Sequence, residues 1–168
     1  MRMTSKRPRP FTNILCPIDF SDPSRAALQV AKDLADDPAV HLTVLYVHDP
    51  TVAGAEAIVF SNRPLSDVRR EVREFATNVL TPALARAGTT RYVAAVGQPA
   101  QEILRIAKRR RCDLIVIGSR GLGGIRKLLL GSTTDHVVHH ASIPVLAIRS
   151  GKPTKRRTRK DRSLRMAG

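Results

Sequence analysis

Short apolar runs alternate with longer amphipathic stretches along most of the chain. The runs are too short for helices and rich in β-branched residues, which is typical of buried parallel strands. The longer stretches repeat apolar residues at helical spacing. This regular alternation predicts an α/β fold with an open parallel sheet and helices on both faces. The five predicted strands comprise residues 13–18, 41–47, 92–96, 114–117 and 143–148.

Capping residues and prolines set the predicted helix boundaries. Asp22 followed by Pro23 predicts an N-cap and a first helical residue, with the helix continuing through Ala35. A long helix is predicted over residues 65–87, where Pro82 indicates a kink or a broken last turn.

The last predicted helix runs from Thr133 to Ala141, and Ser132 with Asp135 matches an S-x-x-D capping box at its start. Pro17 is awkward in the first predicted strand, because proline supplies no amide donor to a ladder. A bend near the end of that strand would relieve the problem.

The formal net charge of +15 is concentrated at the two ends of the 168-residue chain. Residues 1–10 contain four basic residues and no acid, and residues 149–168 contain nine basic residues against Asp161. Such ends are expected to be solvated and disordered, and they permit weak, non-specific nucleic-acid contact. The predicted division is a basic arm over residues 1–11, one domain over residues 12–149 and a basic tail over residues 150–168.

The compartment is predicted from what the chain lacks. No apolar run approaches the roughly 20 residues that span a bilayer, and the basic N-terminus has no apolar segment of a secretory signal. Cys16 and Cys112 lie in or beside predicted strands without a C-x-x-C motif, so we interpret them as buried packing residues. We expect a cytoplasmic protein with no membrane contact.

A glycine-rich segment after the fourth predicted strand is the strongest functional signal. Gly118 and Gly121 are followed, nine residues later, by Gly131 and Ser132 at the start of a new helix. Glycines let a backbone approach phosphate closely, and a helix start adds unpaired amide donors and a positive dipole end. The spacing matches neither a Walker A loop nor a G-x-G-x-x-G dinucleotide motif. We therefore expect a nucleotide site of another kind.

Five segments together resemble the universal stress protein family: ILCPIDFS, VGQP, DLIVIGSRG, LLLGSTTDHVV and IPVLAI. The resemblance covers residues 12–149. It implies a Rossmann-like sheet in the strand order 3-2-1-4-5 and a homodimer paired through the last strand, from Pro144 to Arg149. One branch of the family binds ATP through a G-x2-G-x9-G-[ST] signature, and this chain has every fixed position of that signature.

The same resemblance assigns residue roles. Asp19 would contact the base or ribose, and Val47 the adenine through its backbone. Apart from the resemblance, Mg²⁺ is expected to accompany the phosphates, and the positive charge of Arg120 in the loop is expected to counter theirs. The predicted nucleotide-binding residues are Asp19, Val47, Ile117, Gly118, Arg120, Gly121, Gly131, Ser132 and Thr133.

Efficient catalysis is not indicated, because no residue near the glycine loop is an evident general base or activated nucleophile. We expect at most slow ATP hydrolysis and name no catalytic residue. The alternatives are a dimeric scaffold of the same fold without a nucleotide, and nucleic-acid binding through the basic tails.

Two other clusters receive a structural interpretation. His136, His139 and His140 have a spacing that could hold a metal, but they lack a third ligand type, so we interpret them as surface residues and predict no metal site. The basic run at residues 108–111 is interpreted as compensating the dipole of the helix that it ends.

Overall fold

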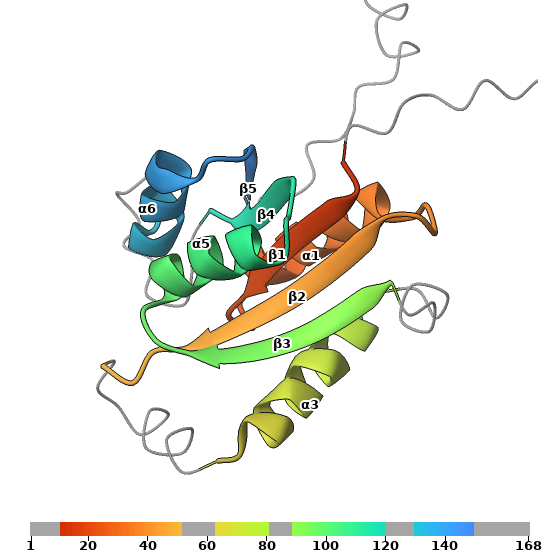
Figure 1. Ribbon diagram of the computed structural model, residues 1–168. Helices are drawn as coiled ribbons and strands as arrows, with labels where there is room; N and C mark the ends of the chain where they lie inside the picture. The colour runs from red at the N-terminus through yellow and green to blue at the C-terminus, as the bar shows by residue number, and fades with distance from the viewer. Residues whose placement is uncertain (1–10, 52–62, 81–88, 120–129, 150–168) are drawn as a thin grey trace, which may run out of the picture.

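The computed structural model describes residues 11–51, 63–80, 89–119 and 130–149. They form a five-stranded parallel sheet in the order β3-β2-β1-β4-β5 (Figure 1), which confirms the predicted fold class and strand order. The strands are β1 (Asn13–Ile18), β2 (His41–His48), β3 (Thr90–Val96), β4 (Leu114–Gly118) and β5 (Val145–Ile148). The described helices are α1 (Asp22–Leu34), α3 (Leu65–Thr77), α5 (Pro99–Arg109) and α6 (Ser132–His140).

Helices cover both faces of the sheet. α1 and α3 pack on one face, and α5 and α6 pack on the other, which faces the viewer in Figure 1. Successive side chains of a strand point to opposite faces. In β1, Leu15 therefore enters the layer beneath α5 and α6, whereas Ile14 and Cys16 enter the layer beneath α1 and α3. Burial on both faces explains why β1 and β4 are almost continuously apolar.

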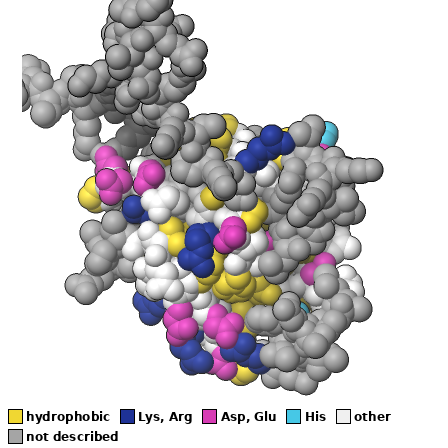
Figure 2. Space-filling model, turned by 180° about the vertical axis from the view of Figure 1, so that it is seen from behind, with side chains coloured by type: hydrophobic (Ala, Val, Ile, Leu, Met, Phe, Trp, Pro, Cys, Tyr) yellow, Lys and Arg dark blue, Asp and Glu magenta, His cyan; other side chains and the backbone are white. Residues whose placement is uncertain are grey.

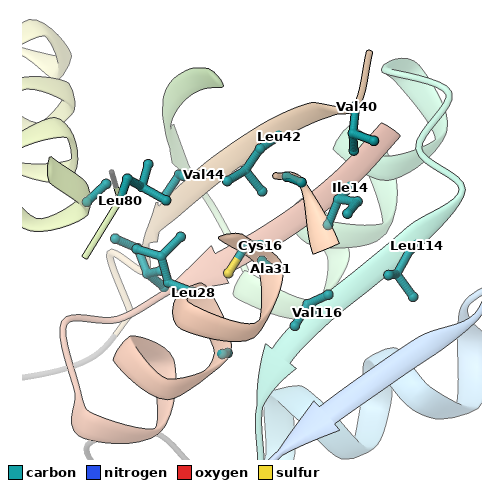
Figure 3. Close-up of a cluster of buried hydrophobic side chains, with 14 of the residues drawn as sticks. Ile14, Cys16, Leu28, Ala31, Val40, Leu42, Val44, Leu80, Leu114 and Val116 are labelled. Carbon is teal, nitrogen blue, oxygen red and sulfur yellow. The ribbon is translucent and has the colours of Figure 1, made fainter. Parts of the chain in front are cut away.

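The layer between the sheet and α1 is built from aliphatic side chains and alanines. Figure 3 shows Leu28 and Ala31 of α1 close to Cys16 of β1, with Val116 of β4 beside them. All four residues are fully buried. The small alanine side chain allows α1 to lie close to the strands, so a chain with few aromatic residues still fills its core.

Pro17 lies within the central strand, and the strand pairing explains why it is tolerated. β1 pairs with β2 from Asn13 to Ile18. Its registered pairs with β4 are those of Ile14 and Leu15 only. Beyond Leu15 the two strands no longer pair, so Pro17 lies where β1 has lost one of its neighbours. A missing amide donor is acceptable at such an edge-like position.

Several helix boundaries differ from the prediction. Ser21, not Asp22, is the N-cap of α1, and its hydroxyl accepts from the amide of Ser24. α3 ends at Thr77, and the rest of the predicted 65–87 helix lies partly outside the described residues. α6 begins at Ser132, so the predicted capping box is wrong: the N-cap is Gly131, which has no side chain to accept a bond.

Both cysteines are free and buried, as predicted. Burial raises the pKa of the Cys16 thiol far above its ordinary value. Burial and the neighbouring Asp113 carboxylate raise the pKa of Cys112 to about 11, although Arg110 opposes the change. Because the thiolate is the reactive form, both residues behave as small packing groups near neutral pH.

The predicted basic tail over residues 150–168, and residues 1–10 of the predicted arm, lie outside the described residues. Among the helices that the structure describes, none has the length and apolar character needed to cross a membrane.

Candidate functional site

The carboxyl ends of β1 and β4 lie at the point where the strand order reverses. The chain continues from β1 to β2 on one side, and β4 occupies the other side of β1. The registered β1–β4 pairs stop at Leu15 and Ile115, which leaves three residues of each strand beyond the last pair. Ligands of open α/β sheets bind at such a switch point, outside the carboxyl ends of the strands.

The start of α6 is attached to the end of β4. The amide of Gly131 donates to the carbonyl of Ser119 over 2.8 Å. The buried Thr134 hydroxyl donates to the carbonyl of Gly118 over 2.7 Å. These two bonds fix the N-terminus of α6 beside the last residue of β4, although ten residues of the loop between them, 120–129, lie outside the described part of the chain.

The N-terminus of α6 presents amides that the helix itself does not use. The first backbone bond of the helix runs from the amide of Asp135 to the carbonyl of Gly131, at 2.8 Å. The amides of Ser132 and Thr133 precede that bond and therefore have no acceptor within the helix. Gly131 contributes no capping side chain. Free amides and the positive end of the helix dipole favour an anion here.

Gly118 has a packing role that differs from the one implied by the sequence. A Cβ atom at this position would lie 2.8 Å from the carbonyl carbon of Pro23 and 2.9 Å from the amide nitrogen of Ser24. The first turn of α1 therefore crosses the end of β4 at backbone contact distance, and only glycine leaves room for it. This close approach brings α1 and β4 together at the candidate site.

Asp19 is connected to this contact through a short chain of hydrogen bonds. Its carboxylate oxygen Oδ1 accepts from the amide of Ser21, at 3.1 Å, and from the Ser21 hydroxyl. The Ser21 hydroxyl in turn accepts from the amide of Ser24, and the Ser24 hydroxyl donates to the carbonyl of Ser21. Oδ2 of Asp19 accepts no bond from another described residue. The carboxylate is therefore held in place while one oxygen stays available.

Phe20 holds the backbone between Asp19 and Ser21 in an uncommon conformation. Its φ of 62° lies in the left-handed region, which is costly for a bulky side chain. The Phe20 ring packs against two other aromatic rings. Its centroid lies 5.0 Å from that of Tyr46 in β2 and 5.3 Å from that of Phe75 in α3. This aromatic contact keeps the turn after β1 in the geometry that orients Asp19.

Val47 and Ile117 are placed so that only their backbones can face a ligand. β2 extends past its last pair with β1, which joins Tyr46 to Ile18, so the backbone of Val47 is unpaired on the β1 side. Its side chain packs against the core layer beneath α5 and α6. The side chain of Ile117 is buried in the same layer.

The structure thus gathers most of the predicted nucleotide residues at one edge. Gly118, Gly131, Ser132 and Thr133 lie together where α6 starts, and Asp19 reaches Gly118 through the first turn of α1. Arg120 and Gly121 lie outside the described residues. Sequence reasoning missed the positioning residues Ser21, Ser24 and Thr134. The only signal for them was the abundance of hydroxyl residues near two helix starts.

The histidines of α6 form a stack and not a metal cluster. The rings of His136 and His140 stack with centroids 4.0 Å apart. Nδ1 of His139 lies 2.8 Å from the carbonyl of Asp135, and Nδ1 of His140 lies 2.8 Å from the carbonyl of His136. Within the described ranges there is no group of three or more histidine, cysteine or acidic residues able to hold a metal ion.

Comparisons with known proteins agree with this architecture. The model of the universal stress protein family matches residues 10–149. Universal stress protein YxiE of Bacillus subtilis is 33% identical over 153 residues, which covers 83% of this chain and 99% of that protein.

Solved structures give the same result. The structure of protein MJ0577 of Methanocaldococcus jannaschii superimposes with a TM-score of 0.66 at 28% identity, covering 84% of this chain and 97% of that one. The structure of an Arabidopsis thaliana protein of the universal stress protein family, solved with AMP bound, has a TM-score of 0.56 at 21% identity. The match covers 83% of this chain and 92% of that one, and it shows a shared fold. From its sequence, its sheet order and these matches, the chain belongs to the universal stress protein family.

Proposed function

We propose that this protein is an ATP-binding regulatory protein of the stress response, with its nucleotide at the carboxyl edge of β1, β2 and β4. The observation that carries the proposal is the uncapped start of α6 beside the end of β4. There the amides of Ser132 and Thr133 have no acceptor within the helix, which is the environment that suits a phosphate. The structure of an Arabidopsis relative with AMP bound supports the same class of ligand.

Each part of the nucleotide has a proposed partner. The available oxygen of Asp19 accepts a hydrogen bond from the ribose or base, and the unpaired backbone of Val47 receives the adenine. Adenine needs a backbone donor and acceptor at its edge, which an unpaired strand end supplies. Gly118 and Ile117 contribute backbone contacts, while Gly131, Ser132 and Thr133 hold the phosphates. Arg120 and Gly121 complete the proposed set.

Mg²⁺ is proposed to accompany the phosphates of ATP. When bound, it neutralises their charge, and it keeps most of its ligands as water and phosphate oxygens. The hydroxyl-rich start of α6 suits that arrangement, because it supplies neutral oxygen ligands and no competing cation. The chain's own contribution is to hold the phosphates still. We propose no more than slow ATP hydrolysis, since no described group at the site is placed to activate a water molecule.

Thermal unfolding with and without Mg·ATP tests the nucleotide site. A ligand at a hundred times its Kd raises the free energy of unfolding by about 2.7 kcal/mol, so millimolar Mg·ATP is expected to raise the melting temperature clearly. The variant Gly131→Val/Ser132→Ala is expected to lose this increase. Valine adopts the extended N-cap conformation of Gly131 (φ −74°, ψ 157°) without strain, and its side chain covers the free amides.

The matched control is Gln98→Val. Gln98 is the N-cap of α5, also extended and without a side-chain cap bond, at the same edge of the sheet. It is expected to keep the full response to Mg·ATP. If Mg·ATP raises the melting temperature of neither the native chain nor the two variants, the nucleotide proposal is wrong. The alternative is then the dimeric scaffold without a nucleotide. Nucleotide content of the protein purified without added ligand gives an independent measurement.

We also propose that the protein is a homodimer that pairs through β5 and the segment from Pro144 to Arg149. Among the described strands, β5 has a neighbour on one side only, which is β4. Leu146 of β5 and Val138 of α6 are 39% and 41% exposed, high values for large apolar side chains. Burial of such residues between two copies supplies the hydrophobic core that an interface needs.

Light scattering on a sizing column tests the dimer. Leu146→Asp is expected to shift the mass from dimer to monomer, because the charge would be buried without a partner. Leu34→Asp is the control: Leu34 is equally exposed, at 39%, but lies at the end of α1. If both variants keep the mass of the native protein, the β5 interface is wrong.

A further inference from the structure

Four consecutive basic residues, Lys108 to Arg111, end α5 on the edge of the sheet opposite the nucleotide site. α5 runs back across the front of the sheet to the start of β4 (Figure 1). Three of these side chains are exposed and that of Arg110 is half-buried. None of the four forms an ion pair or a side-chain hydrogen bond with another described residue. They form a cluster of positive side chains, which we call the α5 basic cluster.

Several basic residues elsewhere on the described surface pair with acids. Figure 2, which views the molecule from the side that carries α1 and α3, shows positive and negative side chains intermixed. Arg70 of α3 lies between Asp67 and Glu74, at 3.4 and 3.9 Å. On α5 itself, Arg105 pairs with Glu102 and holds the pKa of that carboxyl below its usual value. The α5 basic cluster differs because its four cations are consecutive in the sequence and none of them pairs with a described acid.

The backbone at the end of α5 shows that dipole compensation is an incomplete explanation. The amide of Cys112 donates to the carbonyl of Ala107, and that of Arg111 to Lys108, at 2.9 and 3.1 Å. This is the helix ending in which glycine is preferred at the left-handed position. Here Arg111 occupies it, with φ at 53°. Lys108 and Arg109 lie in the last turn, where they counter the helix dipole, and Arg110 and Arg111 add two further positive charges beyond the helix end.

The first described residues of the chain lie at the same place. Both oxygens of the Asp113 carboxylate accept hydrogen bonds at the start of β1: one from the amide and hydroxyl of Thr12, just before the strand, at 2.8 Å, and the other from the amide of Asn13 at 2.9 Å. Asp113 is two residues from Arg111 in the sequence, so these bonds bring the start of β1 close to the cluster. They also occupy the carboxylate oxygens of the acid nearest to Arg111 in the sequence. The sequence before Phe11 holds four further basic residues and no acid: Arg2, Lys6, Arg7 and Arg9.

The acidic residues at the same edge lie on the other face of the sheet. Asp33 and Asp36 are at the end of α1, and Asp37 follows them. α1 covers the opposite face from α5. The edge is therefore divided into a positive side and a negative side, and the positive side adjoins the attachment point of the basic arm.

We propose that the α5 basic cluster is a binding surface for the phosphodiester backbone of double-stranded nucleic acid. Closely spaced cations without acidic partners match closely spaced phosphates, and binding releases condensed counterions. Neither the cluster nor Cys112 and Asp113 carries an aromatic side chain on which single-stranded bases could stack. Contact is therefore with the duplex backbone and independent of sequence. It leaves the opposite edge free for the nucleotide.

Fluorescence anisotropy of a labelled random-sequence DNA duplex, titrated with the full chain at several salt concentrations, tests this surface. In the variant Lys108→Gln/Arg109→Gln/Arg110→Gln, the slope of log K against log salt is expected to fall by about 2–3, since each lost phosphate contact removes about 0.9. The affinity at physiological salt is expected to drop by about ten- to a hundredfold.

The control variant Arg69→Gln/Arg70→Gln/Arg91→Gln removes the same charge from α3 and β3 and is expected to keep a slope close to the native one. Both variants carry the whole C-terminal tail. Equal slopes in the two variants would show that total charge or the tails cause binding, and would overturn the proposal. The proposal would also be overturned if the native chain bound phosphatidylserine vesicles but not the duplex, and the α5 variant lost that vesicle binding. Equal melting temperatures of the two variants confirm that folding is preserved.

Discussion

Replacing Ile115 with alanine is expected to lower the free energy of unfolding by about 2–5 kcal/mol. Ile115 is fully buried and lies in β4, between β1 and β5. Its side chain belongs to the layer beneath α5 and α6, together with Leu15 and Val137. Truncation would remove apolar contacts and leave a cavity that a strand paired on both sides cannot collapse to fill.

Urea denaturation followed by circular dichroism measures this change. The matched control is Leu34→Ala at the end of α1, where the side chain is 39% exposed. Surface substitutions stay within about 0.5 kcal/mol, and the control is expected to cost far less than Ile115→Ala. A cost for Ile115→Ala as small as that of a surface substitution would mean that β4 does not organise the core as the structure describes.

The strands were predictable because their signal is local. Side chains in β1 and β4 are buried on both faces, and this produces uninterrupted apolar runs with clear ends. β1 matches its predicted bounds, Asn13 to Ile18. Helix starts were harder to predict. Ser21 and Asp22 are both good capping residues, and only the hydrogen bond from Ser24 to Ser21 shows which of them acts.

Contacts between distant segments were beyond the reach of sequence patterns. Sixteen residues separate Thr134 from Gly118, and nothing local predicts that its hydroxyl reaches that carbonyl. The glycine signature predicts a ligand site at the strand ends, and Gly118 and Gly131 lie together there. It could not show that Gly118 is required by the backbone of α1, because that requirement depends on the crossing of two elements from opposite halves of the chain.

Gly118→Ala is the second substitution with a large expected effect, and it links the fold to the site. Its new methyl group would lie 2.8 Å from the carbonyl carbon of Pro23, closer than real Cβ contacts allow. Because the clash is with backbone, the first turn of α1 must move away from β4. Overpacking of this kind costs about 1–3 kcal/mol, measurable as a lower urea midpoint.

The displacement also predicts a functional effect that a simple loss of stability would not produce. Asp19 is oriented by Ser21, and Ser21 by the same turn of α1 that Gly118 contacts. We therefore expect Gly118→Ala to weaken Mg·ATP binding, measured by calorimetry well below the melting temperature. Adding Pro23→Ala is expected not to restore stability, because it leaves the clashing backbone in place. Restoration by that second change would show that the proline ring, and not the close approach of α1, sets the requirement for glycine.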